Sequence, residues 1–366
     1  MLKTKAKKIS RQRPWPQHEK KGMAKRGWPA AARQQDHLAL AAAAQVAVGD
    51  ARWPLNYEPL AAALPPTTDL PQVNFLGKRT APLWISPLSL GPQSKKINAA
   101  LAQVCADYKL GWMLGSLRSL LERGRQAGGL EKVSQNYHWR PVVGDIHLWG
   151  NLGISQVAQL VAAHDYQRLL ELVNCLQLDG LVIHINPLQE WWQMEGDRYT
   201  QHPLDVLSKF LAATNLSVIV KEVGQGLGPW SLQRLGELPL AALDLAGLGG
   251  TNFTRLEAQR RGYDDFGMAL VGHSLAEMTA MICARPLKGV KNFILSGGVA
   301  QVPPVFACYQ QLKAIGASCV VAMGFSLLQQ AQKSPQSLAQ FVEQWLHAWM
   351  AAERFCQLAR PGGHDE

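Results

Sequence analysis

Four polar side chains of the types that bind ligands and metals lie close together in the middle of the chain. These residues are His184, Asn186, Gln189 and Glu190. They follow the apolar run Leu181–Ile183, which is typical of a buried strand, and Pro187 is expected to stop that strand in a short turn. Binding side chains gather at strand ends because a rigid element positions them there. A solvated, capped turn is the alternative for any one residue, but the four together favour a functional site.

Glycine-rich segments follow three later apolar runs. Gly297 and Gly298 follow one run, Gly324 follows the next, and upstream Asp244 opens a glycine-rich loop that ends at Thr251. Backbone N–H groups at such turns can cradle a phosphate, and glycine lets the backbone approach the phosphate closely. Tight turns need glycine in any case, so the prediction rests on two such turns lying at neighbouring strand ends.

Cationic side chains occupy comparable positions. Lys221 ends an apolar run, where it could neutralise an anion or an electron-rich cofactor atom. The alternative is a solvated lysine paired with the glutamate that follows it. Ser116 and Arg118 follow another run and suit a phosphate or carboxylate ligand, which arginine binds with its fork of N–H groups. Arg33 and His37 lie near the start of the ordered chain, where His37 is alternatively a surface histidine.

The elements that must position these residues alternate along the chain. Strands are expected at Leu83–Ile85, Trp112–Leu114, Val142–Asp145, Gly180–His184, Ser217–Lys221, Ala242–Leu245, Asn292–Leu295 and Cys319–Ala322. Amphipathic helices are expected between most of them, including Lys95–Tyr108, Ile154–His164, Pro203–Ala213 and Pro304–Ile315, and an earlier one at about Gln35–Val48. About eight strand–helix units predict an α/β fold, a parallel (β/α)8 TIM barrel. An open doubly wound sheet is the alternative, but no GxGxxG fingerprint follows the first strand.

Composition places the protein among cytoplasmic globular proteins. Of 366 residues, 47% are hydrophobic, yet the apolar runs stay shorter than a membrane span needs, and the N-terminus lacks the apolar core of a signal peptide. The six cysteines show no CxxC spacing, which fits reduced thiols better than disulfides or zinc.

The net charge of +10 belongs almost entirely to the N-terminus. Residues 1–32 hold ten Lys or Arg against one Glu, so they carry +9 and leave +1 for the remainder. We expect a basic, disordered tail over 1–32, a barrel domain over 33–350 and a C-terminal tail over 351–366. Weak contact of the tail with RNA or anionic lipid is one interpretation and a solvated extension is the other, and no specific nucleic-acid partner is predicted.

Together these segments resemble the type 2 isopentenyl-diphosphate isomerases from about residue 33 to 328. The most specific match is the pattern His-x-Asn-x-x-Gln-Glu at 184–190, followed by Glu-Gly-Asp-Arg at 195–198. Supporting matches are Val220-Lys221-Glu222-Val223-Gly224, Ala246-Gly247-Leu248-Gly249-Gly250-Thr251, Ser296-Gly297-Gly298, Gly115-Ser116-x-Arg118 and Asn151-Leu152-Gly153.

The resemblance implies interconversion of isopentenyl and dimethylallyl diphosphate, with reduced FMN, Mg²⁺, and NADPH as the reductant of the flavin. It implies that Glu190 holds Mg²⁺ and that Gln189 is catalytic, facing the allylic carbon. It assigns to the diphosphate Arg33, His37, Ser116, Arg118, His184, Asn186 and Gln189. It assigns to FMN Ser89, Ser116, Asn151, Lys221, Thr251, Gly297, Gly298, Ala322 and Met323. A homo-oligomer, tetrameric or larger, is also implied.

The chain departs from the family pattern at three places. Leu90 replaces a glycine of the turn after the first barrel strand, Gln34 replaces a lysine, and Leu117 replaces a glutamine. These changes leave open a catalytically weakened FMN-binding relative. Another FMN barrel enzyme, of the 2-hydroxyacid oxidase or dehydrogenase type, is a further alternative, but His273 lacks the matching arginine that such enzymes need.

Overall fold

The computed structural model describes residues 54–64, 69–88, 94–126 and 137–358. The basic segment 1–32, the helix expected at 35–48, and Arg33, Gln34, His37, Ser89 and Leu90 lie outside the described residues.

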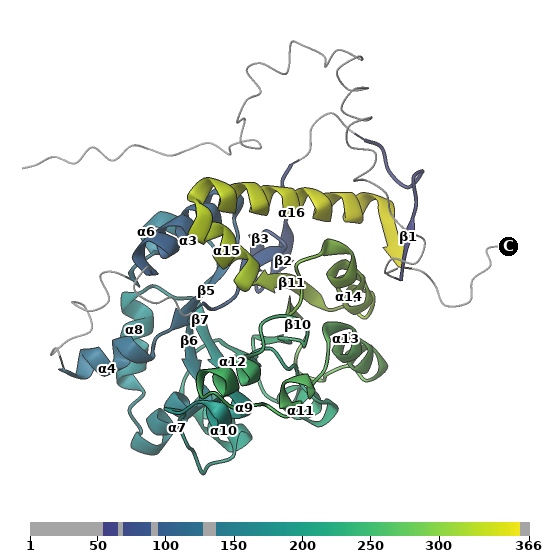
Figure 1. Cartoon of the computed structure of the whole chain (residues 1–366). Coiled ribbons are helices and arrows are strands. Elements are labelled where there is room, and N and C mark those ends of the chain that lie inside the picture. The colour runs from purple at the N-terminus through teal and green to yellow at the C-terminus, as the bar shows by residue number, and fades with distance from the viewer. Residues whose placement is uncertain (1–53, 65–68, 89–93, 127–136, 359–366) are drawn as a thin grey trace, which may run out of the picture. The chain divides into compact units, whose positions relative to one another are not determined.

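A closed barrel of eight parallel strands forms the centre of the described chain (Figure 1). The strands are β4 (Leu83–Ile85), β5 (Gly111–Ser116), β6 (Leu148–Gly153), β7 (Gly180–His184), β8 (Val218–Lys221), β9 (Ala242–Asp244), β10 (Asn292–Ser296) and β11 (Ser318–Met323). They follow one another in chain order around the barrel, which β9 and β10 complete by pairing in parallel. The predicted (β/α)8 barrel is thereby confirmed.

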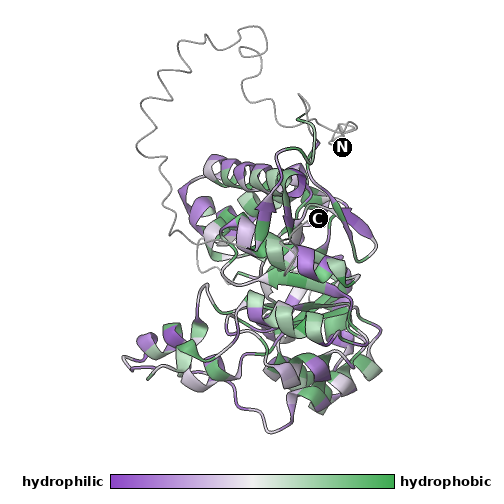
Figure 2. Cartoon of the chain, turned by 90° about the vertical axis from the view of Figure 1, so that its right-hand side faces the viewer, coloured by the Kyte–Doolittle hydropathy of each residue, from purple (hydrophilic) through white to green (hydrophobic). Residues whose placement is uncertain are grey.

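Helices connect the strands and cover the outside of the barrel. They are α3 (Ser94–Tyr108), α4 (Arg118–Gln126), α6 (Arg140–Val143), α7 (Ile154–Ala163), α8 (Gln167–Cys175), α9 (Pro187–Trp192), α10 (Pro203–Ala213), α11 (Pro229–Leu235), α12 (Phe253–Arg260), the 3₁₀ turn η2 (Met268–Leu270), α13 (Leu275–Ala284), α14 (Val302–Ala314), α15 (Phe325–Lys333) and α16 (Pro335–Phe355). Hydrophobic and hydrophilic residues both occur along these helices (Figure 2), and most of the hydrophobic side chains are buried. Because helices cover the sheet, the strands are apolar on both faces.

One predicted strand is wrong. Residues 142–145 do not form the third barrel strand: Val142 and Val143 end α6, whose first turn contains Pro141, and the strand is β6. Strand β6 was not predicted because it contains glycines, and glycine weakens the sequence pattern of a strand. In the structure a Cβ on Gly150 would lie 2.7 Å from Leu117 Cδ1, so a larger residue would require that leucine side chain to shift.

A short hairpin closes the N-terminal end of the barrel. Strands β2 (Val73–Phe75) and β3 (Lys78–Thr80) pair antiparallel, and Phe75 joins the inner apolar cluster of the barrel. His147, which precedes β6, bonds through Nε2 to the Phe75 carbonyl oxygen at 2.8 Å. Lys78 forms ion pairs with Asp145 (2.8 Å) and Asp179 (2.9 Å). The described hairpin thus covers the N-terminal end of the barrel, opposite the carboxyl ends of the strands.

The C-terminal part of the chain is more ordered than the sequence suggests. Helix α16 continues through residue 350 to Phe355, and β12 (Cys356–Leu358) follows it at once and pairs antiparallel with β1 (Leu55–Tyr57) (Figure 1). Within the described residues, no helix combines the length and apolarity needed to cross a membrane.

Candidate active site

The segment after β7 brings its polar side chains together at the mouth of the barrel. The chain does not make the expected turn there; Asn186 precedes the short helix α9, and Pro187 occupies its first turn, where the lack of an N–H is tolerated. Asn186 is buried, and its Nδ2 donates to Gln189 Oε1 (3.0 Å) and Glu190 Oε1 (3.1 Å). The predicted convergence of three of the four polar residues is confirmed.

Glu190 is held by bonds to both carboxylate oxygens. Besides Asn186 on Oε1, the N–H of Asp197 donates to Oε2 at 2.7 Å. Arg198 folds back over α9 and donates to the carbonyl oxygens of Glu190 and Trp191. A carboxylate has about four acceptor positions, so an oriented Glu190 keeps capacity for a cation or a further donor.

The fourth residue, His184, ends β7 and pairs with a neighbouring strand. Its Nδ1 lies 3.0 Å from Asn151 Oδ1, at the end of β6. Burial, with a smaller contribution from the charge of Lys221, lowers the pKa of His184 to about 3. The imidazole is therefore neutral at physiological pH, with one nitrogen donating and the other accepting.

Three ionisable side chains lie buried at the ends of β8 and β9. Lys221 is only 8% exposed and pairs in register with His184 on one side and Asp244 on the other. Its Nζ donates to the backbone oxygen of Glu222, so the alternative of a solvated lysine is wrong. Burial raises the pKa of the Glu222 and Asp244 carboxyls. Charged groups without a close counter-ion are costly inside a protein, which points to a functional location.

One carboxylate oxygen of Asp244 accepts no hydrogen bond within the described chain. Its Oδ1 accepts from Ser296 Oγ and from the N–H of Ala246, whereas Oδ2 has no partner among the described residues. From the sequence, Asp244 was expected only to open a glycine-rich loop. An acidic residue at the end of an otherwise apolar strand was the signal available.

Glu222 organises the loop that follows β8. Its Oε2 accepts from the N–H groups of Gly224 (2.6 Å), Gln225 and Gly226 (3.1 Å). Gln225 in turn donates through Nε2 to the carbonyl oxygens of Met268 (3.1 Å) and Val271 (2.6 Å). The loop thereby anchors the chain around η2, which lies more than forty residues later in the sequence. Sequence reasoning missed this role because the partners are distant.

The glycine-rich loops after β9 and β10 pack backbone against backbone. A Cβ on Gly297 would overlap the carbonyl oxygen and nitrogen of Gly247, and one on Gly250 would lie 3.0 Å from the nitrogen of Gly298. Gly297 and Gly298 have φ of +92° and +70°, a left-handed region that favours glycine. Within the described chain no hydrogen bond is made by the N–H of either residue. Thr251 lies beside this region, against Gly224.

Ser116 and Arg118 lie on the other side of His184. Ser116 ends β5 and is paired in register with Asn151. Arg118 begins α4 and donates to Glu122 Oε1 (2.8 Å) and Asp197 Oδ2 (2.9 Å). The two residues therefore belong to the same mouth as His184.

Two predicted FMN residues have a different environment. Ala322 and Met323, at the end of β11, are both buried, and Ala322 belongs to the apolar cluster inside the barrel. Among the described residues, no group of three or more His, Cys, Asp or Glu side chains is placed to hold a metal ion. Any cation at Glu190 would need ligands from elsewhere.

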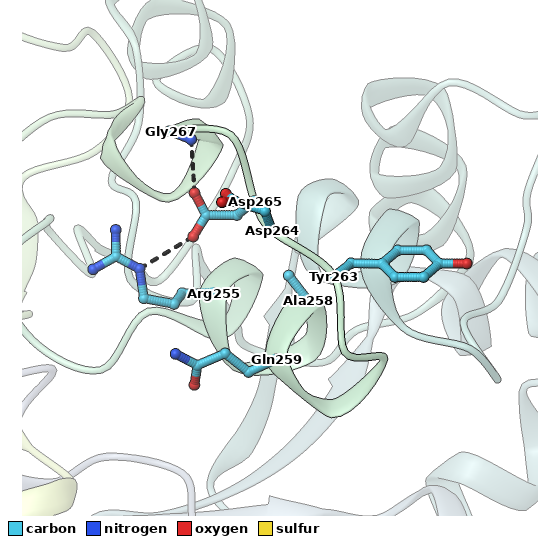
Figure 3. Close-up of a pocket in the computed structure, with 7 residues that line it drawn as sticks. All are labelled: Arg255, Ala258, Gln259, Tyr263, Asp264, Asp265 and Gly267. Carbon is cyan, nitrogen blue, oxygen red and sulfur yellow. Dashed lines mark hydrogen bonds and ion pairs between the residues drawn. The ribbon is translucent and has the colours of Figure 1, made fainter.

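A separate pocket of about 390 Å³ lies on α12 and the loop that follows it (Figure 3). Arg255 Nε donates to Asp265 Oδ2 (3.1 Å), and the N–H of Gly267 donates to Asp265 Oδ1 (2.8 Å). None of the predicted site residues lines this pocket. The chemistry is better placed at the strand ends.

Comparison with known proteins identifies the family. No family model matches the chain. Two solved structures show some likeness to this chain. One is mandelate oxidase, with a TM-score of 0.47, 13% identity and 82% of each chain covered. The other is a flavocytochrome b2 with sulfite bound, with a TM-score of 0.49, 15% identity, and 86% of this chain and 79% of that one covered. The barrel assignment rests on the strand pairing of this chain and not on these two structures. The isopentenyl-diphosphate delta-isomerase of Xanthobacter autotrophicus is 39% identical over 188 residues, 51% of this chain and 52% of the relative. That of Synechococcus sp. is 32% identical over 307 residues, 79% of this chain and 82% of the relative. With this identity across most of both proteins, and with the barrel expected for the type 2 form, the chain is an enzyme of the type 2 isopentenyl-diphosphate delta-isomerase family.

Proposed function

We propose that the enzyme interconverts isopentenyl diphosphate and dimethylallyl diphosphate in isoprenoid biosynthesis, with FMN and Mg²⁺ as cofactors and NADPH as the reductant of the flavin. The observation that carries the proposal is the oriented set Asn186, Gln189 and Glu190, which lies beside His184 and the buried Lys221 at one barrel mouth. The names of the relatives supply the reaction, and the residues present are compatible with it.

The loops after β10 and β11 fit an FMN phosphate. The N–H groups of Gly297 and Gly298 make no bond within the described chain, and a side chain on Gly297 would clash. The adjacent helix α15 begins after Gly324 without a side-chain cap, so its first N–H groups are also available to an anion. Lys221 and the open Oδ2 of Asp244 offer a cation and an acceptor to the polar edge of the flavin.

When bound in its reduced form, FMN supplies an electron-rich ring that stabilises positive charge developing on the alkene. Gln189 positions the alkene beside this ring. Because Asn186 holds the Gln189 carbonyl oxygen, the amide NH₂ group is the end left to face the substrate. An amide does not titrate in the physiological range, so Gln189 orients the reacting carbons and does not act as the acid.

His184, Ser116 and Arg118 bind the diphosphate in this proposal, whereas Asn186, which gives both Nδ2 hydrogens to Gln189 and Glu190, orients those two side chains. A neutral His184 donates to a phosphate oxygen only when the ring proton is on Nε2. Asn151 favours that tautomer when its amide presents NH₂ to Nδ1, which requires only a half-turn of the amide at the observed 3.0 Å separation. The low pKa of His184 keeps this arrangement constant across physiological pH.

Glu190 holds Mg²⁺ in this proposal. Mg²⁺ binds carboxylate and phosphate oxygens and is usually held by one or two carboxylates together with substrate phosphates and water. A single oriented carboxylate near diphosphate-binding residues fits that pattern. The cation therefore binds together with the substrate.

An anaerobic assay with FMN, NADPH, Mg²⁺ and isopentenyl diphosphate tests the proposal. Formation of dimethylallyl diphosphate that requires FMN supports it, and FMN binding without product contradicts it. Glu190→Gln should raise the Mg²⁺ concentration for half-maximal activity at least about tenfold, by analogy with other losses at metal sites. Glu195→Gln is the matched control, because Glu195 is exposed and pairs with Arg260 at 2.8 Å.

A cytoplasmic homo-oligomer, tetrameric or larger, is part of the same proposal. All six cysteines are free, which suits a reducing compartment. Large apolar side chains are exposed around α12 and η2, and Phe266 (88% exposed) and Leu270 (68% exposed) are the most accessible of them. Such surfaces favour association. Light scattering after size-exclusion chromatography measures the assembly.

A further inference from the structure

One carboxylate outside the assigned site residues accepts hydrogen bonds from two separate parts of the chain. Asp197, in the loop after α9, accepts from Arg118 Nη1 (2.9 Å), Ser155 Oγ (3.0 Å) and Gln156 Nε2 (2.6 Å), all on Oδ2. Arg118 also reaches Oδ1 through Nη2 at 3.5 Å. The Asp197 side chain is 17% exposed, so these bonds are made largely away from water.

The backbone of the same residue contacts Glu190. The N–H of Asp197 donates to Glu190 Oε2 at 2.7 Å. Asp197 can hold this N–H in place because its own side chain is anchored to β5–α4 on one side and to the start of α7 on the other. The position of the Glu190 carboxylate therefore depends on the Asp197 side chain, although the two carboxylates do not bond each other.

Arg118 remains able to bind a ligand while it is held. A guanidinium has five N–H donors. Glu122 takes the one on Nε, and Asp197 takes one on each terminal nitrogen. The two remaining N–H groups, one on each terminal nitrogen, have no partner among the described residues and can bind phosphate oxygens. Asp197 thus orients the fork through both terminal nitrogens and leaves one N–H group on each for a ligand.

We propose that Asp197 is a positioning residue, which fixes the diphosphate-binding guanidinium of Arg118 and the Mg²⁺-binding carboxylate of Glu190 relative to each other. This inference rests on the proposed function, since it takes the ligand to be a Mg²⁺–diphosphate. Asp197 touches neither cation nor substrate; it sets the distance between the two groups that do.

Asp197→Asn tests this directly. An asparagine has no charge and only one acceptor oxygen. With that oxygen in the Oδ2 position its NH₂ group faces Arg118 Nη2, and in the reverse orientation it faces the donors of Arg118, Ser155 and Gln156. We expect the dissociation constant for isopentenyl diphosphate and the Mg²⁺ requirement to rise together, each about tenfold, as lost hydrogen bonds to charged groups imply. Glu122→Gln is the matched control. It removes the negative charge that pairs with Arg118 but leaves the contacts of the Glu190 loop unchanged. Because this ion pair is exposed, we expect less than about a threefold change in ligand affinity and none in Mg²⁺ requirement.

Calorimetric titration with Mg²⁺ and isopentenyl diphosphate, in the presence of oxidised FMN, measures binding without turnover. A wild-type enzyme that binds the ligand yet yields no product with reduced FMN would refute the proposed reaction, while the binding data still decide the role of Asp197. Ser155→Ala removes one donor to Asp197 and serves as a milder variant if Asp197→Asn does not fold. It should shift both affinities in the same direction by a smaller factor.

Two results would overturn the inference. Unchanged affinities in a folded Asp197→Asn or Ser155→Ala enzyme would show that Glu190 and Arg118 are positioned without Asp197. Tighter ligand binding in Asp197→Asn would show that Asp197 competes with the diphosphate for Arg118.

Discussion

Replacing Gly297 by alanine should damage the fold and the proposed phosphate loop together. The residue has φ +92°, and a Cβ there would lie 2.7 Å from Gly247 C and closer still to the nitrogen and oxygen of that peptide. The atoms in the way are backbone, so no side chain can rotate to relieve the contact. The loops after β9 and β10 would have to separate.

The size of the effect follows from two contributions. A left-handed backbone costs a non-glycine residue about 1–2 kcal/mol. Overpacking adds about 1–3 kcal/mol, so Gly297→Ala should lower the free energy of unfolding by about 2–5 kcal/mol. Gly316 is the matched control, because its φ is +81° and nothing lies within 4 Å of a Cβ built there. Gly316→Ala should therefore cost only the backbone contribution.

Urea unfolding of both variants, followed by circular dichroism, separates the two contributions. Flavin fluorescence then measures FMN affinity, which we expect to fall at least about tenfold in Gly297→Ala, equivalent to 1.4 kcal/mol, and to stay unchanged in Gly316→Ala. Equal destabilisation of the two variants would refute the close backbone approach. Full FMN affinity in a destabilised Gly297→Ala would show that the phosphate binds elsewhere.

Two further predictions concern the groups around the mouth. Folded His184 has a pKa of about 3, whereas an unfolded histidine has a pKa of about 6.5. Between these two pH values only the unfolded chain takes up the proton, which favours unfolding. His184 should therefore lower the free energy of unfolding by about 2 kcal/mol at pH 5 relative to pH 7. His184→Asn should remove this part of the acid sensitivity in urea titrations at the two pH values, and parallel losses in both proteins would contradict the assignment. Gln225→Ala leaves the Met268 and Val271 carbonyls without their donor and should cost about 2–4 kcal/mol, with faster hydrogen exchange at residues 268–273. Gln233→Ala, which removes one exposed bond to Arg285, should leave that exchange unchanged.

The strands of the barrel were largely predictable because both of their faces are buried. Their apolar runs stand out from the amphipathic helices, and β4 and β7 begin and end where the sequence indicates. Strand β6 was not recognised because it contains Gly150 and Gly153. A Cβ at either position would crowd neighbouring side chains, and at Gly153 it would lie 2.9 Å from His184 Nε2. Residues that serve close packing and the site weaken the pattern by which strands are recognised.

The site was predictable where its residues are close in sequence. His184 to Glu190 form one short segment, so a strand end and a helix start suffice to bring them together. The partners of Asp197 are 79, 42 and 41 residues away, and no local pattern reveals them. The motif Glu195-Gly196-Asp197-Arg198 was recognised by resemblance, but its physical role emerged only from the contacts.

The two ends of the barrel differ in how their charged groups are buried and paired. At the closed end Lys78 forms ion pairs with Asp145 and Asp179, and all three side chains are partly or largely exposed. At the open end Lys221 and Asp244 are more deeply buried, yet the lysine bonds a backbone oxygen and the aspartate keeps one oxygen without a partner in the described chain. An unpartnered buried polar atom costs about 1–3 kcal/mol. A structural role gives no reason to retain that cost, whereas a polar cofactor that bonds both groups would remove it on binding.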